Sequence, residues 1–355
     1  MRARFLLLLL TLTAAPTSLV VACIWDYDTL RMELAKFPES LDLITGKFRR
    51  HSDDYYRWRL EDRSSRIPTD PAQWTAAHHK DLDDLAVAHD KLGDSIRAVE
   101  IATRQLEISP DRYESLANRG TFSIHGGDLA TGLTDLRRAI EINPDAHFGR
   151  EIVQIRVVEY LLAERAAGRG TPPLTKPEFR PTPNGFAAFC EALDPPLPRP
   201  EALKGLLGMM RFGNYDSPIL LDLVGELLYL EDHKRLSTRA YLKVSYEVED
   251  ETLSKKFRAL AKEALLMQTP KPGEAEDLPL ADLERQFKAE LLEAENFFNE
   301  LRENERRWIE AGDDVDQKYA ETYFGEEPPA KKPGTASLFM LIGGLAVAAA
   351  LFRKV

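Results

Sequence analysis

The side chains best suited to chemistry in this chain are its seven histidines, and their spacing predicts no metal site. His78 and His79 are adjacent, so their rings would point apart on a helix. Within residues 175–311, the local candidate for a catalytic group is His233, which follows Glu231 and Asp232 in a predicted turn. An enzyme or sensor domain in 175–311 would have to rely on this cluster.

Other patterns of catalytic or cofactor-binding residues are missing from the sequence. The chain holds no calcium-loop pattern, no Gly-x-Ser-x-Gly, no phosphate loop and no dinucleotide fingerprint. Runs of carboxylates such as Asp81, Asp83 and Asp84 are typical of a solvated helix face. We therefore predict no metal, no cofactor and no enzymatic activity.

Composition narrows the class of partner. The formal net charge is −11 and the isoelectric point is about 5.3, which disfavours nucleic-acid binding because that needs a basic face. The two cysteines, Cys23 and Cys190, are too few for a disulfide scaffold.

A repeat of 34 residues is the clearest pattern in the sequence. Gly93 and Gly127 are 34 residues apart, and the residues around them repeat at the same interval. The further pairs are Asp94 and Asp128, Ala98 and Gly132, Val99 and Leu133, Glu107 and Glu141, Ile108 and Ile142, and Pro110 and Pro144. We expect a helix–turn–helix in each unit, with a glycine at the turn and a proline after the second helix.

The two units, 79–112 and 113–146, resemble the tetratricopeptide repeat family in their period and in the positions of their glycine and proline residues. The small residues Ala86, Gly120, Ala98 and Gly132 stand where that family brings paired helices close together. The match has departures, since neither unit has an aromatic residue at His89 or Ser123 and Arg119 replaces the usual leucine. The resemblance implies an all-α fold that forms a binding surface.

The same resemblance implies a groove lined by the first helix of each unit. The groove-lining residues that it assigns are Asp83, Val87 and Lys91 from the first unit, and Asn118, Thr121 and His125 from the second. Asn118 matches the asparagine with which many groove-binding members hold a peptide backbone. Asp83 and Asp84 stand where members that bind acidic tails carry Lys and Arg, so we expect a neutral or basic partner segment.

Hydrophobic periodicity and proline-rich breaks divide the rest of the chain. Ser217–Leu230 and Leu236–Val248 have the shape of a third, degenerate unit, with Ala240 as its expected small contact residue. The stripe of Leu283, Phe287, Leu291, Ala294, Phe298, Leu301 and Trp308 predicts a long amphipathic helix that either docks on the body or dimerises. The predicted divisions are an N-terminal helical cap at 23–78, two repeat units at 79–146, a capping helix at 147–167, a proline-rich linker at 168–200, a helical repeat-like segment at 201–268, the long helix at 279–311 and an acidic, proline-rich stalk at 312–334.

Both ends of the chain carry apolar segments. Residues 1–22 resemble a secretory signal, and Cys23 after Val20-Val21-Ala22 is either a lipidation site or the first mature residue, unless the segment remains as an anchor. Residues 336–352 are uncharged and predict a transmembrane helix, with a sorting signal that is later clipped as the alternative.

Together these features predict a non-catalytic scaffold that is exported to the bacterial cell envelope and tethered to a membrane, with its body outside the cytoplasm. It would bind another envelope protein in its groove. Two alternatives remain open: an enzyme or sensor domain in 175–311 with the repeats as a recognition arm, and an architectural homo-oligomer formed through the 279–311 helix.

Overall fold

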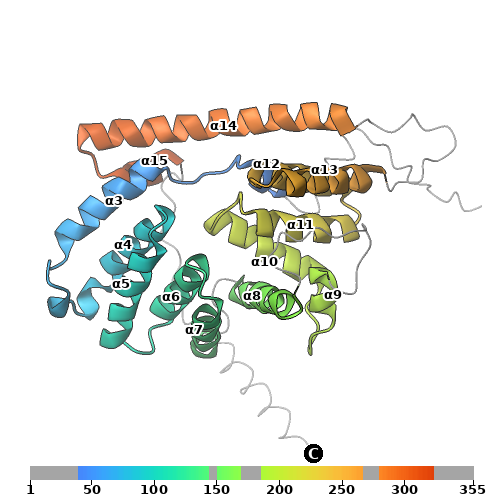
Figure 1. The fold of residues 1–355 in the computed structure, drawn as a ribbon. Coiled ribbons are helices and arrows are strands. Elements are labelled where there is room, and N and C mark those ends of the chain that lie inside the picture. Colours follow the sequence, from blue (N-terminus) through green and yellow to red (C-terminus); the bar gives the residue numbers. More distant parts are fainter. Residues whose placement is uncertain (1–38, 144–149, 169–184, 267–279, 324–355) are drawn as a thin grey trace, which may run out of the picture. The chain divides into compact units, whose positions relative to one another are not determined.

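The computed structural model describes residues 39–143, 150–168, 185–266 and 280–323, and these residues fold into helices with no strand among them (Figure 1). This confirms the predicted all-α class. The chain divides into two compact units: unit 1 comprises Met1–Thr45 and Pro172–Glu290, and unit 2 comprises Gly46–Thr171 and Leu291–Val355. The described residues include no helix that is long and apolar enough to cross a bilayer. Residues 1–22, Cys23 and 336–352 lie outside the described residues.

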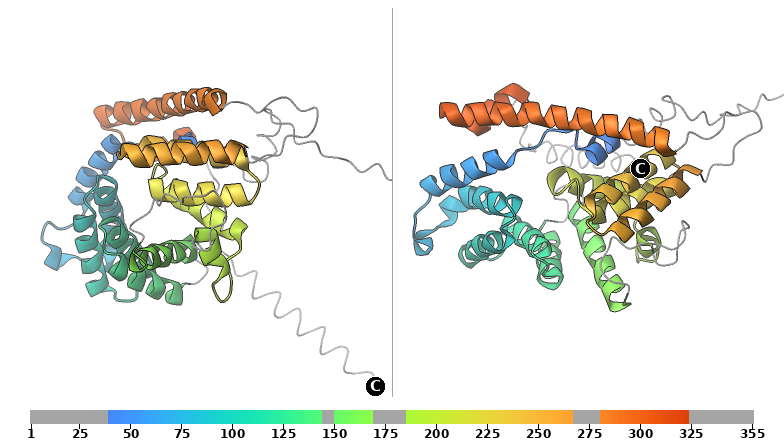
Figure 2. Two further views of the ribbon diagram at one scale, coloured as in Figure 1. Left: turned by 45° about the vertical axis from the view of Figure 1, so that its right-hand side comes forward. Right: turned by 45° about the horizontal axis from the view of Figure 1, so that its top comes forward.

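Unit 2 is built around a succession of helices in which each packs on the next (Figure 2). Its members are α3 (Asp53–Arg66), the short 3-10 helices η1 (Pro71–Gln73) and η2 (Ala76–His78), α4 (His79–Lys91), α5 (Ser95–Ile108), α6 (Tyr113–His125), α7 (Leu129–Ile142) and α8 (Arg150–Ala166). The bounds of α6 are those of α4 displaced by 34 residues, and α7 is displaced from α5 by the same amount. The sequence repeat is therefore a repeat of helical hairpins.

The turn inside each hairpin depends on a glycine with positive φ. Gly93 has φ 87° and Gly127 has φ 90°, the left-handed geometry that costs a glycine little. The next residue then begins the second helix, because the carboxylates of Asp94 and Asp128 accept backbone hydrogen bonds from Arg97 and Thr131, respectively. The same Gly-Asp pair thus ends one helix and caps the next in both hairpins.

Substituting either turn glycine is expected to be costly for conformational reasons alone. No atom lies within 4 Å of a Cβ built on Gly93. Gly93→Ala should therefore lower the free energy of unfolding by about 1 kcal/mol, purely because alanine is strained in the left-handed backbone conformation. Gly126→Ala is the matched control, because Gly126 has φ −75° and an added Cβ meets its nearest neighbour at an ordinary 3.4 Å. Urea unfolding followed by circular dichroism should separate the two variants, and equal stability would contradict this account of the turn.

Unit 1 contains a third hairpin with the same dimensions, α11 (Pro218–Leu230) and α12 (Lys234–Glu247). Asp232, with φ 65°, takes the place of Gly93 and Gly127, and the His233 amide donates to the Leu228 carbonyl at 2.8 Å. Ala240, the expected small contact residue, is fully buried on α12, and the Ser237 hydroxyl of the same helix donates to the Gly225 carbonyl at 2.7 Å. The predicted third hairpin is therefore present as two helices that pack on each other.

The remaining helices of unit 1 surround this hairpin. They are α2 (Ser40–Thr45), α9 (Phe186–Glu191), α10 (Arg199–Phe212), α13 (Glu251–Leu266) and the first turns of α14 (Leu280–Ala311). On α12, the Arg239 side chain is 1% exposed and pairs bidentately with Glu290 of α14 at 2.7 and 2.8 Å. This ion pair fixes the start of α14 to the third hairpin.

The end of α14 and the helix that follows it pack in unit 2. Glu305 is fully buried, and its carboxylate contacts His51 Nδ1 at 2.6 Å and accepts from the Ser52 amide at 3.0 Å. The Tyr55 hydroxyl donates to Asp316 of α15 (Val315–Tyr323) at 2.5 Å. The start of α3 and the residues before it are thereby joined to residues some 250 positions later.

Three predicted divisions need correction. Residues 315–323 are not a stalk but the helix α15, whose Val315 and Tyr319 are buried, because an apolar stripe at four-residue spacing lies among the charges. The described end of the proline-rich linker contains α9, which buries Phe186 and Cys190. The predicted N-terminal cap is divided, since α2 belongs to unit 1 and α3 to unit 2.

The apolar stripe of α14 docks within the chain, as the buried side chains of Leu283, Phe287 and Leu301 show.

Candidate binding surface

The first helices of the two hairpins in unit 2 pack against each other and place the predicted groove residues on α4 and α6. We call this surface the first-helix face; it comprises Asp83, Val87, Lys91, Asn118, Thr121 and His125. His125 joins the two helices, because its Nδ1 lies 2.8 Å from the Asp90 carboxylate of α4. Asp90 is held in turn by the Ser95 hydroxyl at 2.8 Å.

Asp83 is placed differently from a groove residue that awaits a ligand. Its carboxylate pairs with Arg112 at 2.5 and 2.8 Å and accepts from the Gln105 amide at 2.9 Å. Asp84 is likewise neutralised, by Arg59 at 3.3 Å and Arg63 at 2.9 Å. The negative charge behind the expectation of a neutral or basic partner is therefore balanced within the chain.

Among the other predicted groove residues, Asn118 differs from those whose side chains already pack or hydrogen-bond within the chain. Val87 packs against the core of the first hairpin, and the Thr121 hydroxyl accepts from Gln154 of α8 at 3.2 Å. Lys91 is half-buried at the end of α4. Asn118 is half-buried on α6, and its side chain makes no hydrogen bond within the described part of the chain. Its amide group can therefore still donate and accept.

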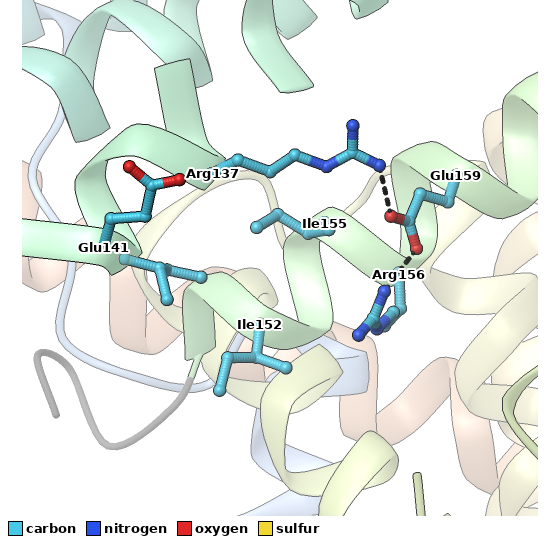
Figure 3. Close-up of a pocket in the computed structure, with 7 residues that line it drawn as sticks. Arg137, Glu141, Ile152, Ile155, Arg156 and Glu159 are labelled. Atoms are coloured by element: carbon cyan, nitrogen blue, oxygen red, sulfur yellow. Dashed lines mark hydrogen bonds and ion pairs between the residues drawn. The ribbon is translucent and has the colours of Figure 1, made fainter. Parts of the chain in front are cut away.

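A pocket of about 400 Å³ opens between α7 and α8, and sequence reasoning did not identify it (Figure 3). Its apolar lining consists of Ile140, Ile152 and Ile155, and Ile152 remains 37% exposed. The polar lining consists of Arg137 and Glu141 from α7 and Arg156 and Glu159 from α8. The lining is thus mixed, with four charged side chains beside three isoleucines, so a ligand would need both an apolar part and a polar part.

The charged groups of this pocket converge on one carboxylate. Glu159 accepts from Arg137 at 2.8 Å and from Arg156 at 2.7 Å, so its two oxygens are both occupied (Figure 3). Burial alone would raise the pKa of Glu159, but the hydrogen bonds from Arg156 and Arg137 outweigh it and hold that pKa below its ordinary value. Glu159 is therefore ionised near neutral pH and orients both guanidinium groups.

A signal for the α8 side of this pocket was present in the repeat. Ile152, Ile155 and Glu159 follow Asn118, Thr121 and His125 by 34 residues each. These are the positions at which a third unit would carry its groove residues. The contribution of α7 had no such signal, because Arg137 and Ile140 meet α8 only through the packing of the two helices.

The candidate catalytic cluster of unit 1 contains one buried and one exposed side chain. His233 is buried at the start of α12, whereas the Asp232 side chain is 76% exposed and pairs with Lys234 at 3.2 Å. Within the described residues, no group of three His, Cys, Asp or Glu side chains is placed to hold a metal ion. The binding surfaces of unit 2 are the stronger candidates for function.

Comparisons with protein-family models, curated protein sequences and solved structures find no match to this chain.

Proposed function

We propose that this protein is a non-catalytic scaffold that binds another protein of the bacterial cell envelope through the first-helix face of its tetratricopeptide-like hairpins. The residue that carries the proposal is Asn118. Its neighbours Thr121 and His125 are hydrogen-bonded to other helices of the chain, whereas the Asn118 amide has no partner among the described residues. A half-buried amide that remains unpaired is suited to hold the backbone of a partner segment.

Rigidity of the first-helix face supports binding by a preformed surface. The contact between Asp90 and His125 joins α4 to α6, and the contact between Thr121 and Gln154 joins α6 to α8. A surface held in this way loses little conformational entropy when a ligand binds. Stacked helical hairpins provide such extended surfaces without any catalytic group.

A membrane tether completes the proposal. The apolar segments at 1–22 and 336–352 are its sequence basis, with Cys23 as a further candidate for lipidation. Confining the scaffold to the membrane that also carries its partner raises the effective concentration of each for the other. The alternative in which the 279–311 helix drives oligomerisation is less favoured, because its buried stripe already packs within the chain.

The test is site-specific photo-crosslinking in the native host. A photo-reactive amino acid at position 118 should give a discrete adduct, and the same group at Glu100 of α5 should give none. Glu100 is a suitable control because its side chain is 57% exposed and its ion pair with Arg97 stays within α5. The protein in the adduct is then identified by mass spectrometry and purified.

Binding of that protein decides the role of Asn118. We expect Asn118→Ala to weaken binding about tenfold, the effect of losing hydrogen bonds to a peptide backbone, with Glu100→Ala unchanged. Thermal melts of both variants establish that the fold is retained. The proposal fails if position 118 gives no adduct, or if Asn118→Ala binds the partner as tightly as the unchanged chain.

A further inference from the structure

The pocket between α7 and α8 combines apolar walls with an excess of hydrogen-bond donors. Arg137 and Arg156 each use a single terminal nitrogen on Glu159, and these are the only hydrogen bonds of either guanidinium in the described residues. A guanidinium group carries five N–H donors, so most of them remain unused. Each oxygen of Glu159 already accepts one hydrogen bond, so the two guanidinium groups offer more unused donors than Glu159 offers unused acceptor positions.

The second acidic residue of the pocket does not change this balance. Glu141 accepts from Arg138 at 2.8 Å, and Arg138 is also paired with Asp111 at 2.9 Å. Arg137 is 57% exposed and Arg156 is 30% exposed, so both can reach an incoming ligand. A carboxylate fits two such guanidinium groups, since each can offer it paired N–H donors.

The apolar walls define the second half of the ligand. Ile140, Ile152 and Ile155 line a volume of about 400 Å³, which has room for a large apolar side chain and the backbone that carries it. We propose that the α7–α8 pocket binds a partner peptide through a large apolar side chain and a neighbouring Asp or Glu side chain. The apolar group lies against the isoleucines, and the carboxylate bridges Arg137 and Arg156.

This inference rests on the proposed function, because it takes the ligand to be a segment of a protein. The 34-residue register supports a peptide, since Ile152, Ile155 and Glu159 occupy the positions equivalent to Asn118, Thr121 and His125. The partner segment assigned here is acidic, in contrast to the neutral or basic segment expected from Asp83 and Asp84. Those two carboxylates are already paired with arginines of the chain.

The experiment measures fluorescence anisotropy of labelled hexapeptides with blocked ends, titrated with the full chain. The probe is Gly-Ser-Leu-Glu-Ser-Gly. It is compared with three variants: one carries Gln in place of Glu, one carries Lys in place of Glu, and one carries Ser in place of Leu. We expect the probe to bind, and the Gln and Ser peptides to bind about tenfold more weakly. A fifth peptide, which ends in Leu with a free carboxylate, distinguishes a chain terminus from an acidic side chain.

Charge reversal gives a test that loss of folding cannot imitate. Arg137→Glu combined with Arg156→Glu should reverse the order, so that the Lys peptide binds more tightly than the Glu peptide. Arg97→Glu is the matched control, because Arg97 is an exposed arginine of α5 that pairs with Glu100 at 2.7 Å. It should leave the peptide order unchanged.

The outcomes separate this inference from the proposed function. If no hexapeptide binds at millimolar concentration, or if the Glu and Gln peptides bind equally, the inference is wrong. Preference for the free terminus over the Glu side chain also overturns it. An adduct from position 118 would leave the proposed function standing in those cases. If the Glu peptide binds with the expected order but position 118 captures nothing, the first-helix face fails and the α7–α8 pocket stands.

Discussion

Arg239→Met is expected to cost about 3 kcal/mol of stability in unit 1, the largest effect that we predict for a single side chain. Arg239 is 1% exposed and holds Glu290 through two hydrogen bonds of 2.7 and 2.8 Å. Methionine fills much of the same volume but leaves the Glu290 carboxylate, which is only 23% exposed, without its counter-charge. The measurement is the free energy of unfolding in urea at neutral pH.

A double-mutant cycle identifies the cause of that loss. Arg239→Met with Glu290→Met removes both charges, so most of the lost stability should return. The single variant Glu290→Met isolates the other half of the pair. If the double variant is as unstable as the sum of the two single variants, lost packing rather than an uncompensated charge explains the effect.

Gly132→Ala is expected to destabilise the second hairpin of unit 2 by about 2 kcal/mol, even though alanine is the better helix former. A Cβ on Gly132 would lie 2.6 Å from Cγ1 of Ile124 and 2.7 Å from the carbonyl oxygen of Gly120. The carbonyl belongs to the backbone of α6, so the new methyl group can be accommodated only if α6 and α7 separate. Thermal unfolding followed by circular dichroism measures the loss.

Gly120 provides a graded comparison for this prediction. An added Cβ there would meet the Gly132 carbonyl and the Leu136 side chain at 3.0 Å, so Gly120→Ala should be the milder substitution. The stabilities should therefore fall in the order unchanged chain, Gly120→Ala, Gly132→Ala. The reverse order would show that the spacing of α6 and α7 is not what demands a glycine at position 132.

The hairpins of unit 2 could be predicted from sequence because their signals are local. A glycine with positive φ and a capping aspartate stand at each turn, and the 34-residue interval relates the two hairpins. The third hairpin was harder to define, since Asp232 replaces the turn glycine. Function-related contacts were harder still, because Asp83 is neutralised by Arg112, which lies 29 residues away.

The α7–α8 pocket shows why a site of this kind escapes sequence reasoning. Three isoleucines and two arginines at helical spacing are read as ordinary amphipathic pattern. They can be recognised as one site only because Arg137 of α7 and Arg156 of α8 bind the same carboxylate, that of Glu159. That meeting depends on how the two helices pack, which periodicity does not specify.

The interleaving of the two units in the chain has a consequence for biosynthesis. The hairpins from α4 to α7 leave the ribosome long before Glu305 and Asp316, the residues that bind His51 and Tyr55 in the same unit. Unit 1 is also completed late. Its first described helix, α2, is synthesised before unit 2, whereas the ion pair of Arg239 requires Glu290. Neither unit can complete its core until translation has reached α14, so both units stay incomplete for most of the synthesis of the chain.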